Sequence, residues 1–261
     1  MRMTKMPVVV LIPTILFVSF AAPARAARAV SYVAMGDSYS AGAGAGNYVN
    51  SGCARSANAF SALWARAHPA AAYSAVTCAG ATTTSLLRSQ LPTLTATSTL
   101  VSLTIGGNDI GFADVLTACY LRGDAGCRTA VDAAEEKATT VLPAKLDQVY
   151  KAIKAHAPHA QIVVMNYPDF YSGNAACAGI SVRSQAKIDE GNGVLSHVTE
   201  VAARRNGVVF VDARRSFAQH TVCSADPWIS GVVRAHVNDS YHPTAVGQRS
   251  GYLAAFNTVA K

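Results

Sequence analysis

Residues 29–42 read AVSYVAMGDSYSAG, and this stretch decides the expected fold. Its first part, residues 29–34, is a short apolar run of the length of a buried β-strand, and Gly36 follows where a strand would pass into a loop. Four further runs of short apolar or β-branched residues have the same character and also end in loop-forming residues. They cover residues 73–77, 100–105, 161–166 and 208–212.

Segments with helical period or high helix propensity lie between these runs. They include residues 59–67, 129–156 and 182–205, with a last one after Pro243. Strands that alternate with helices predict an α/β fold with a five-stranded parallel sheet covered on both faces. In such sheets the ligand site lies at the carboxyl ends of the strands, so we examine those ends for polar motifs.

The N-terminus is typical of a secretory signal peptide. Arg2 and Lys5 precede an uncharged run, residues 7–20, which is followed by small residues. A membrane-spanning helix needs about 20 apolar residues, and this run is shorter and interrupted by Pro13. Cleavage sites of the A-x-A type end at Ala26 and Ala29. We therefore expect a signal peptide over residues 1–26, one mature domain over 27–261, a secreted product and no integral membrane segment after cleavage.

The charge pattern argues against a nucleic-acid partner. The formal net charge of +7 falls by three to +4 when Arg2, Lys5 and Arg25 leave with the signal peptide. The remaining basic residues are scattered, without a basic stripe or stacking aromatic residues. The glycines of residues 41–46 lack the following Lys-Ser/Thr of a phosphate-binding loop and the dinucleotide glycine spacing, so this stretch favours a flexible loop on the substrate side.

Six cysteines remain in the expected mature chain, and no two of them are spaced as a zinc-binding pair. An even number in an exported chain favours three disulfides. Pairing nearest neighbours would join Cys53 with Cys78, Cys119 with Cys127 and Cys177 with Cys223, although the sequence leaves other pairings open. We expect no metal and no organic cofactor.

A candidate nucleophile follows the first expected strand. Ser38 stands between the Gly36 turn and the start of a helix, where its hydroxyl could face a cleft and its N–H would be a free helix-terminal donor. Gly-Asp-Ser is also ordinary turn chemistry. The neighbouring motifs therefore decide the interpretation.

Candidate hydrogen-bond donors follow the next two strands. Gly80 offers a backbone N–H without a side chain in the way, and Asn108 offers a side-chain amide. With the N–H of Ser38 they would form a three-donor oxyanion hole, which stabilises the charge that develops on a carbonyl oxygen. Taken singly, Gly80 fits a turn and Asn108 a helix cap, but their arrival after consecutive strands favours the joint site.

A candidate base lies near the C-terminus. His242 is preceded by Asp239 and followed by Pro243, which suits the first position of a helix. Histidine can take a serine proton at neutral pH, and a carboxylate three residues earlier could hydrogen-bond its other nitrogen and fix its tautomer. The sequence thus predicts Ser38, His242 and Asp239 as a catalytic triad.

Taken together, the blocks resemble a known family. Residues 36–40, Gly80, residues 106–109 and residues 239–243 occur in the order found in the SGNH hydrolases, also called GDSL esterases and lipases. The signal peptide and six cysteines are similar to those of the secreted actinomycete lipases in that family. The resemblance implies a flavodoxin-like three-layer α/β/α sandwich, the same triad and the same oxyanion hole. Some members of the family use a backbone carbonyl in place of the acid, so a backbone carbonyl is the alternative to Asp239 as the group that orients His242.

The expected function is hydrolysis of acyl or lipid esters through an acyl-Ser38 intermediate, by a secreted monomer. The sequence has no long hydrophobic insertion that would form a lid, which favours an open site. An acyl groove could be lined by Phe112, Tyr120 and Tyr167, although such aromatic residues are more often part of the core. Two enzymatic alternatives use the same site, a carbohydrate O-deacetylase and an acyltransferase. The alternative from another class is a non-catalytic surface-binding protein that keeps the fold.

Overall fold

The structure is a computed structural model that describes residues 1–4, 6, 30–173, 177 and 179–260. The expected signal-peptide cleavage sites lie outside the described residues. In the part of the chain that is described, no helix is long and apolar enough to cross a membrane.

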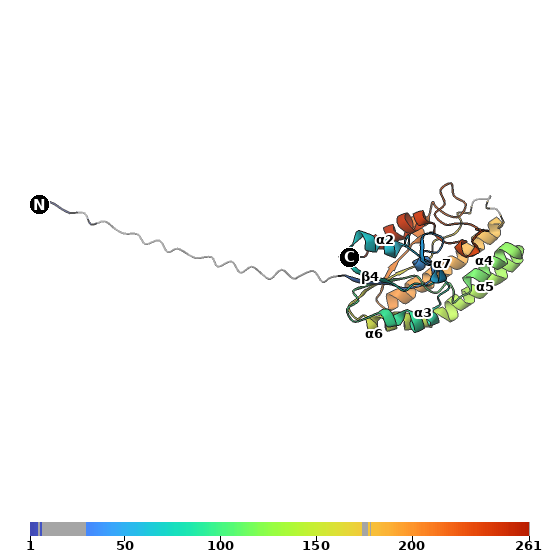
Figure 1. The fold of residues 1–261 in the computed structure, drawn as a ribbon, viewed down its shortest axis with the longest axis horizontal. Coiled ribbons are helices and arrows are strands. Elements are labelled where there is room, and N and C mark those ends of the chain that lie inside the picture. Colours follow the sequence, from blue (N-terminus) through green and yellow to red (C-terminus); the bar gives the residue numbers. More distant parts are fainter. Residues whose placement is uncertain (5, 7–29, 174–176, 178, 261) are drawn as a thin grey trace.

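A five-stranded, all-parallel sheet forms the centre of the fold (Figure 1). Four of the five predicted runs contain one of its strands, and the run 73–77 overlaps the fifth, which begins one residue earlier at Ala72. The strands lie in the order β4-β1-β5-β6-β7. Every residue of β5 is buried, because helices cover both faces of the sheet and leave no polar side to the strand. The strands are β1 (Ser31–Ala34), β4 (Ala72–Ala75), β5 (Leu100–Leu103), β6 (Gln161–Met165) and β7 (Val209–Val211).

Two helical layers enclose this sheet, so the predicted three-layer arrangement is confirmed (Figure 1). One layer contains α2 (Phe60–Ala67), the π-helix η4 (Gly247–Tyr252) and α9 (Leu253–Asn257). It packs on β1 through aromatic rings, with Tyr32 5.2 Å from Trp64 and 5.7 Å from Phe256 between ring centroids. The other layer contains α3 (Thr83–Ser89), α5 (Gly123–Thr140), α6 (Leu142–His156) and α7 (Val182–Arg205).

The helices differ from the sequence prediction in two ways. The segment 129–156, expected as one helix, is divided between α5 and α6 at Val141, because Pro143 lies in the first turn of α6, where a helix starts easily but does not continue from an earlier one. The helices α3 and α4 (Phe112–Leu121) were not predicted. Helix α4 begins after Gly111, whose φ of +82° is left-handed and which provides no side-chain cap.

Short elements and disulfides complete the fold. An antiparallel pair, β2 (Tyr48–Asn50) and β3 (Arg55–Ser56), follows the short helix α1 (Ser38–Ala41). The remaining short elements are η1 (Ser51–Cys53), η2 (Leu91–Thr93), α8 (Arg214–Phe217) and η3 (Val237–Asp239). The disulfides follow the nearest-neighbour pairing: Cys53–Cys78, Cys119–Cys127 and Cys177–Cys223.

The order of the strands determines where ligands can bind. The chain passes from β1 to β4 on one side and then to β5 on the other side of β1. The loops after β1, β4 and β5 therefore diverge at the carboxyl edge of the sheet, where α/β proteins bind their ligands. These loops carry Ser38, Gly80 and Asn108.

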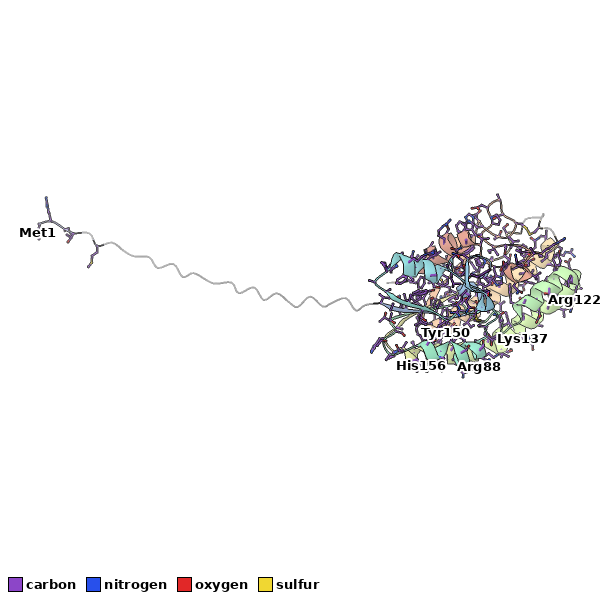
Figure 2. The ribbon with its side chains drawn as sticks, in the orientation of Figure 1. Met1, Arg88, Arg122, Lys137, Tyr150 and His156 are labelled. Carbon is purple, nitrogen blue, oxygen red and sulfur yellow. A yellow bond between two sulfur atoms is a disulfide. The ribbon has the colours of Figure 1, made fainter. Side chains whose placement is uncertain are left out.

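Basic side chains on the outer helices are spread out. Figure 2 shows Arg88, Lys137 and Arg122 spaced along the outer edge of the helical layer. This distribution agrees with the scattered charge seen in the sequence.

Candidate active site

The turn after β1 presents Ser38 at the first position of α1. Asp37 caps this helix, and its buried carboxylate accepts hydrogen bonds from the N–H of Tyr39 at 3.1 Å and from the hydroxyl of Thr104 at 2.6 Å. Gly36 has a φ of +114°, and a Cβ atom there would collide with the backbone of Thr104. The glycine therefore lets the turn approach β5 closely. The N–H of Ser38 donates to no acceptor within the described residues and stays available at the helix terminus.

His242 lies directly against Ser38. Its Nε2 atom is 2.7 Å from the Ser38 hydroxyl oxygen, although the two residues are 204 positions apart in the sequence. Burial lowers the pKa of His242 to about 4, against the opposing influence of the Ser240 carbonyl, the Asp239 charge and the Asn238 carbonyl. The imidazole is therefore neutral at neutral pH, which is the form that can accept a proton.

Asp239 does not make the hydrogen bond that the sequence predicted. Its Oδ1 atom accepts a hydrogen bond from the hydroxyl of Tyr48 at 2.6 Å. The buried Nδ1 atom of His242 has no hydrogen-bond partner among the described residues, and the carbonyls of Ser240 and Asn238 influence the pKa of the ring. The Asp239 carboxylate, at the end of η3, is thus bonded to Tyr48 on β2.

The turn that carries His242 is fixed by residues that sequence reasoning missed. Ser230 donates from its N–H to the His242 carbonyl at 2.9 Å and from its hydroxyl to the Asp239 carbonyl at 2.6 Å. Tyr241 has a φ of +58°, in the left-handed region, and its carbonyl accepts a hydrogen bond from the Tyr39 hydroxyl at 2.5 Å. Nothing in the local sequence marks Ser230, whereas Tyr39 stands beside the candidate nucleophile.

The two other donor candidates are linked to each other. The side chain of Asn108 donates to the carbonyl of Ala81 at 2.9 Å, and Asp109 accepts from the N–H of Thr83 at 2.9 Å. These bonds tie the loop after β5 to the loop that holds Gly80, whose φ of +77° favours glycine. The N–H of Gly80 makes no hydrogen bond within the described chain, so it remains a free donor.

Tyr167 connects the Asn108 loop to the Ser38 turn. Its hydroxyl accepts a hydrogen bond from the N–H of Gly107 at 3.0 Å and donates to the Asp37 carboxylate. Burial raises the pKa of Asp37 to about 6, although the hydrogen bonds from Thr104, Tyr167 and the backbone oppose this rise. Tyr167 was expected as a groove-lining aromatic residue, and its bracing role was not predicted because its partners are distant in sequence.

Four of the five predicted site residues line one cavity of about 500 Å³, and Asp239 is the one that does not. The four are Ser38, Gly80, Asn108 and His242. Its volume is within the range of small-molecule sites, about 300–1,000 Å³. The aromatic residues Phe112, Tyr120 and Tyr167 line it as well, together with four aliphatic side chains. These aliphatic residues are Leu116, Leu121, Val232 and Val237.

One histidine outside the cavity lies beside an acidic side chain. The side chain of His220 lies 3.3 Å from Asp226 and stacks on Trp228, with ring centroids 3.5 Å apart. In the described ranges, no three His, Cys, Asp or Glu side chains come together as metal ligands would.

Comparison with known proteins identifies relatives over most of the chain. Residues 34–250 match the GDSL-like Lipase/Acylhydrolase family. "Lipase 1" of Streptomyces coelicolor is 42% identical over 239 residues, which cover 91% of this chain and 89% of that protein. The crystal structure of phospholipase A1 from Streptomyces albidoflavus NA297 has a TM-score of 0.87 and 42% identity, covering 89% of this chain and 100% of that one. The extracellular lipase of Streptomyces rimosus has a TM-score of 0.86 and 43% identity over the same shares.

Proposed function

The chain belongs to the GDSL-like lipase/acylhydrolase family, and on this basis we propose that it hydrolyses carboxylic esters through an acyl intermediate on Ser38. The observation that carries the proposal is the 2.7 Å contact between Ser38 Oγ and His242 Nε2 within a cavity that also exposes the donor candidates. A nucleophile in hydrogen-bond contact with a neutral imidazole is the arrangement that acyl transfer requires.

The reaction begins with transfer of the Ser38 proton to Nε2 of His242. The Ser38 oxygen attacks the ester carbonyl carbon, and the carbonyl oxygen becomes an oxyanion. The N–H groups of Ser38 and Gly80 and the second amide hydrogen of Asn108 stabilise this oxyanion. As the tetrahedral intermediate collapses, His242 gives its proton to the leaving alcohol. Water then attacks the acyl-enzyme with His242 again as base, and the acid is released.

The role of orienting His242 falls to the backbone in this proposal. A neutral imidazole that accepts at Nε2 carries its proton on Nδ1, which the carbonyls of Ser240 and Asn238 favour. The Asp239 carboxylate is bound to Tyr48 and contributes only its charge. We therefore assign the orienting role to the Ser240 carbonyl, the backbone alternative of the family, because it raises the pKa of His242 although Nδ1 makes no hydrogen bond within the described residues.

The apolar wall of the cavity favours a lipid ester with an acyl chain longer than acetate. Leu116, Leu121, Val232 and Val237 offer a surface for methylene groups, and burying each methylene contributes about 0.8 kcal/mol. An O-acetyl sugar would leave this surface uncovered, so the deacetylase alternative is less well supported. The proteins called lipase and phospholipase A1 among the relatives agree with this choice.

We infer that the protein works outside the cell after removal of residues 1–26. Three disulfides suit an oxidising compartment, and a relative at 43% identity is an extracellular lipase. We propose that the mature chain acts as a monomer. Size-exclusion chromatography with light scattering of residues 27–261 tests the monomer, and mass spectrometry of the exported protein tests the cleavage site.

The central experiment measures hydrolysis of p-nitrophenyl esters from acetate to palmitate together with labelling by a fluorophosphonate probe. We expect rates that rise beyond acetate and stoichiometric labelling, both abolished in Ser38→Ala. The matched control is Ser51→Ala, because Ser51 is another serine that lines the same cavity, and this variant should keep the label. Activity confined to acetate would favour the carbohydrate deacetylase, and a folded protein without label or activity would favour the binding-protein alternative.

A further inference from the structure

Three consecutive residues of the nucleophile turn reach three different parts of the site. Asp37 bonds to Thr104 and Tyr167, Ser38 to His242, and Tyr39 to the carbonyl of Tyr241. We propose that Tyr39 is a positioning residue for His242, because its hydroxyl holds the left-handed Tyr241 peptide that carries the histidine to Ser38. This inference rests on the proposed function.

The hydroxyl of Tyr39 is built to act as a donor. It lies in the core with 3% of the residue exposed, and it is 2.5 Å from the carbonyl oxygen of Tyr241. Burial raises the pKa of Tyr39 well above its ordinary value, so the phenol keeps its proton. A donor buried with one carbonyl acceptor loses a whole hydrogen bond when that carbonyl moves.

The rest of Tyr39 is fixed, so its hydroxyl is a firm reference point. Gln248 donates to its carbonyl at 3.0 Å and also accepts from the N–H of Phe60 at 2.9 Å. The ring stands edge-on to Tyr167 at 4.9 Å and lies 5.1 Å from the ring of His242. Tyr39 therefore cannot follow the His242 turn if that turn relaxes.

The Tyr241 peptide needs such a restraint. Its φ of +58° is unfavourable for any residue with a Cβ atom. The Tyr39 bond, together with donation from the Tyr241 N–H to Ser230 at 3.1 Å, holds this conformation. Relaxation toward ordinary dihedral angles would rotate the next residue, His242, and lengthen its 2.7 Å contact with Ser38.

The first test removes only the Tyr39 oxygen. In Tyr39→Phe we expect kcat for p-nitrophenyl butyrate to fall about fivefold, the rate equivalent of one buried hydrogen bond, with KM changing much less. The matched control is Tyr32→Phe, because Tyr32 is 1% exposed and its hydroxyl shares a buried hydrogen bond with that of Ser102 at 2.6 Å, and neither residue lines the cavity. That variant should lose comparable stability and keep its kcat.

The second test asks whether the conformation of residue 241 carries the effect. Tyr241→Gly and Tyr241→Ala both remove the ring, but only glycine adopts the left-handed conformation freely. Each substitution at residue 241 is made in two backgrounds, one with the wild-type Tyr39 and one with Tyr39→Phe. We expect the ratio of kcat between Tyr241→Gly and Tyr241→Ala to be several-fold larger in the Tyr39→Phe background, where nothing else holds the carbonyl.

The outcomes separate this inference from the proposed function. If Tyr39→Phe loses no more kcat than Tyr32→Phe, or if the Gly-to-Ala ratio is the same in both backgrounds, Tyr39 does not position His242. If Tyr39→Phe does not fold, the comparison is repeated in Tyr39→Leu, which also removes the hydroxyl, and equal Gly-to-Ala ratios there and in the wild type would overturn the inference. Failure of the wild-type protein to label at Ser38 would instead contradict the proposed function itself.

Discussion

Replacing Gly44 by alanine should push His242 away from Ser38. Gly44 has a φ of +81°, and a Cβ atom added there would lie 2.9 Å from the Cβ of His242 and 3.1 Å from the carbonyl oxygen of Pro243. Carbon atoms in contact lie about 3.5–4.0 Å apart. The His242 turn must therefore shift by roughly 0.6–1 Å, which is enough to misalign the 2.7 Å contact with Ser38.

Gly46→Ala is the matched control for this substitution. Gly46 lies two residues further along the same loop with a φ of +64°, but a Cβ atom there would meet nothing within 4 Å. Both variants lose about 1–2 kcal/mol of stability from the left-handed conformation. Gly44→Ala loses a further ~1–3 kcal/mol from the clash, and a displacement of this size at a reacting pair lowers the rate about 100-fold.

The assay combines kcat/KM on p-nitrophenyl butyrate with urea unfolding of each variant. We expect Gly46→Ala to be moderately destabilised with nearly normal activity, and Gly44→Ala to be less stable and nearly inactive while still folded. Equal activity and equal stability in the two variants would refute the packing of Gly44 against the histidine turn.

Three further perturbations test other features. The value of kcat/KM should rise with pH around a midpoint near 4, the lowered pKa of His242, and reach a plateau by neutral pH, because only the neutral imidazole accepts the proton. A midpoint near the ordinary value of 6.5 would contradict the burial of the ring. In Asp239→Asn, kcat for p-nitrophenyl butyrate should fall less than about tenfold, because the carboxylate bonds to Tyr48, whereas His242→Ala should lose at least ~10⁴-fold; similar losses would restore Asp239 as the orienting group. Replacing both cysteines of the Cys53–Cys78 bridge, which closes 25 residues, should lower the free energy of unfolding in urea by about 3.5 kcal/mol. The same change at Cys119–Cys127, which closes 8 residues, should lower it by about 2.5 kcal/mol. The reverse order would show that loop closure does not govern the effect of these disulfides.

The central strands β1, β5 and β6 were predictable from sequence because they are largely buried on both faces. Such strands appear as short, continuous apolar runs, and the run at residues 100–105 contains β5, all of whose residues are buried. The helices were predicted less well. Helix α4 has no side-chain cap, since Gly111 precedes it, and helix propensity continues across Val141 although α5 ends and α6 begins there. Where a helix starts or is interrupted depends on tertiary packing that a periodic pattern does not contain.

The candidate site was predictable where a motif follows a strand. Ser38, Gly80 and Asn108 lie after neighbouring strands, so the topology brings them to one cavity. The partners of Asp239 and Tyr39 were not predictable, because they are about 200 positions away, at Tyr48 and Tyr241. A local spacing of three residues suggested a bond between Asp239 and His242, and a distant tyrosine took that carboxylate instead.

The separation of Ser38 from His242 by 204 residues also has a consequence for the timing of synthesis. Chains emerge from the ribosome with the N-terminus first, so the first strand and the serine turn appear long before the histidine turn. Ser230 holds the histidine turn, and Gln248 fixes Tyr39, which also bonds to that turn. A growing or truncated polypeptide therefore carries the serine without its base, and hydrolytic capacity arises only with the completed chain.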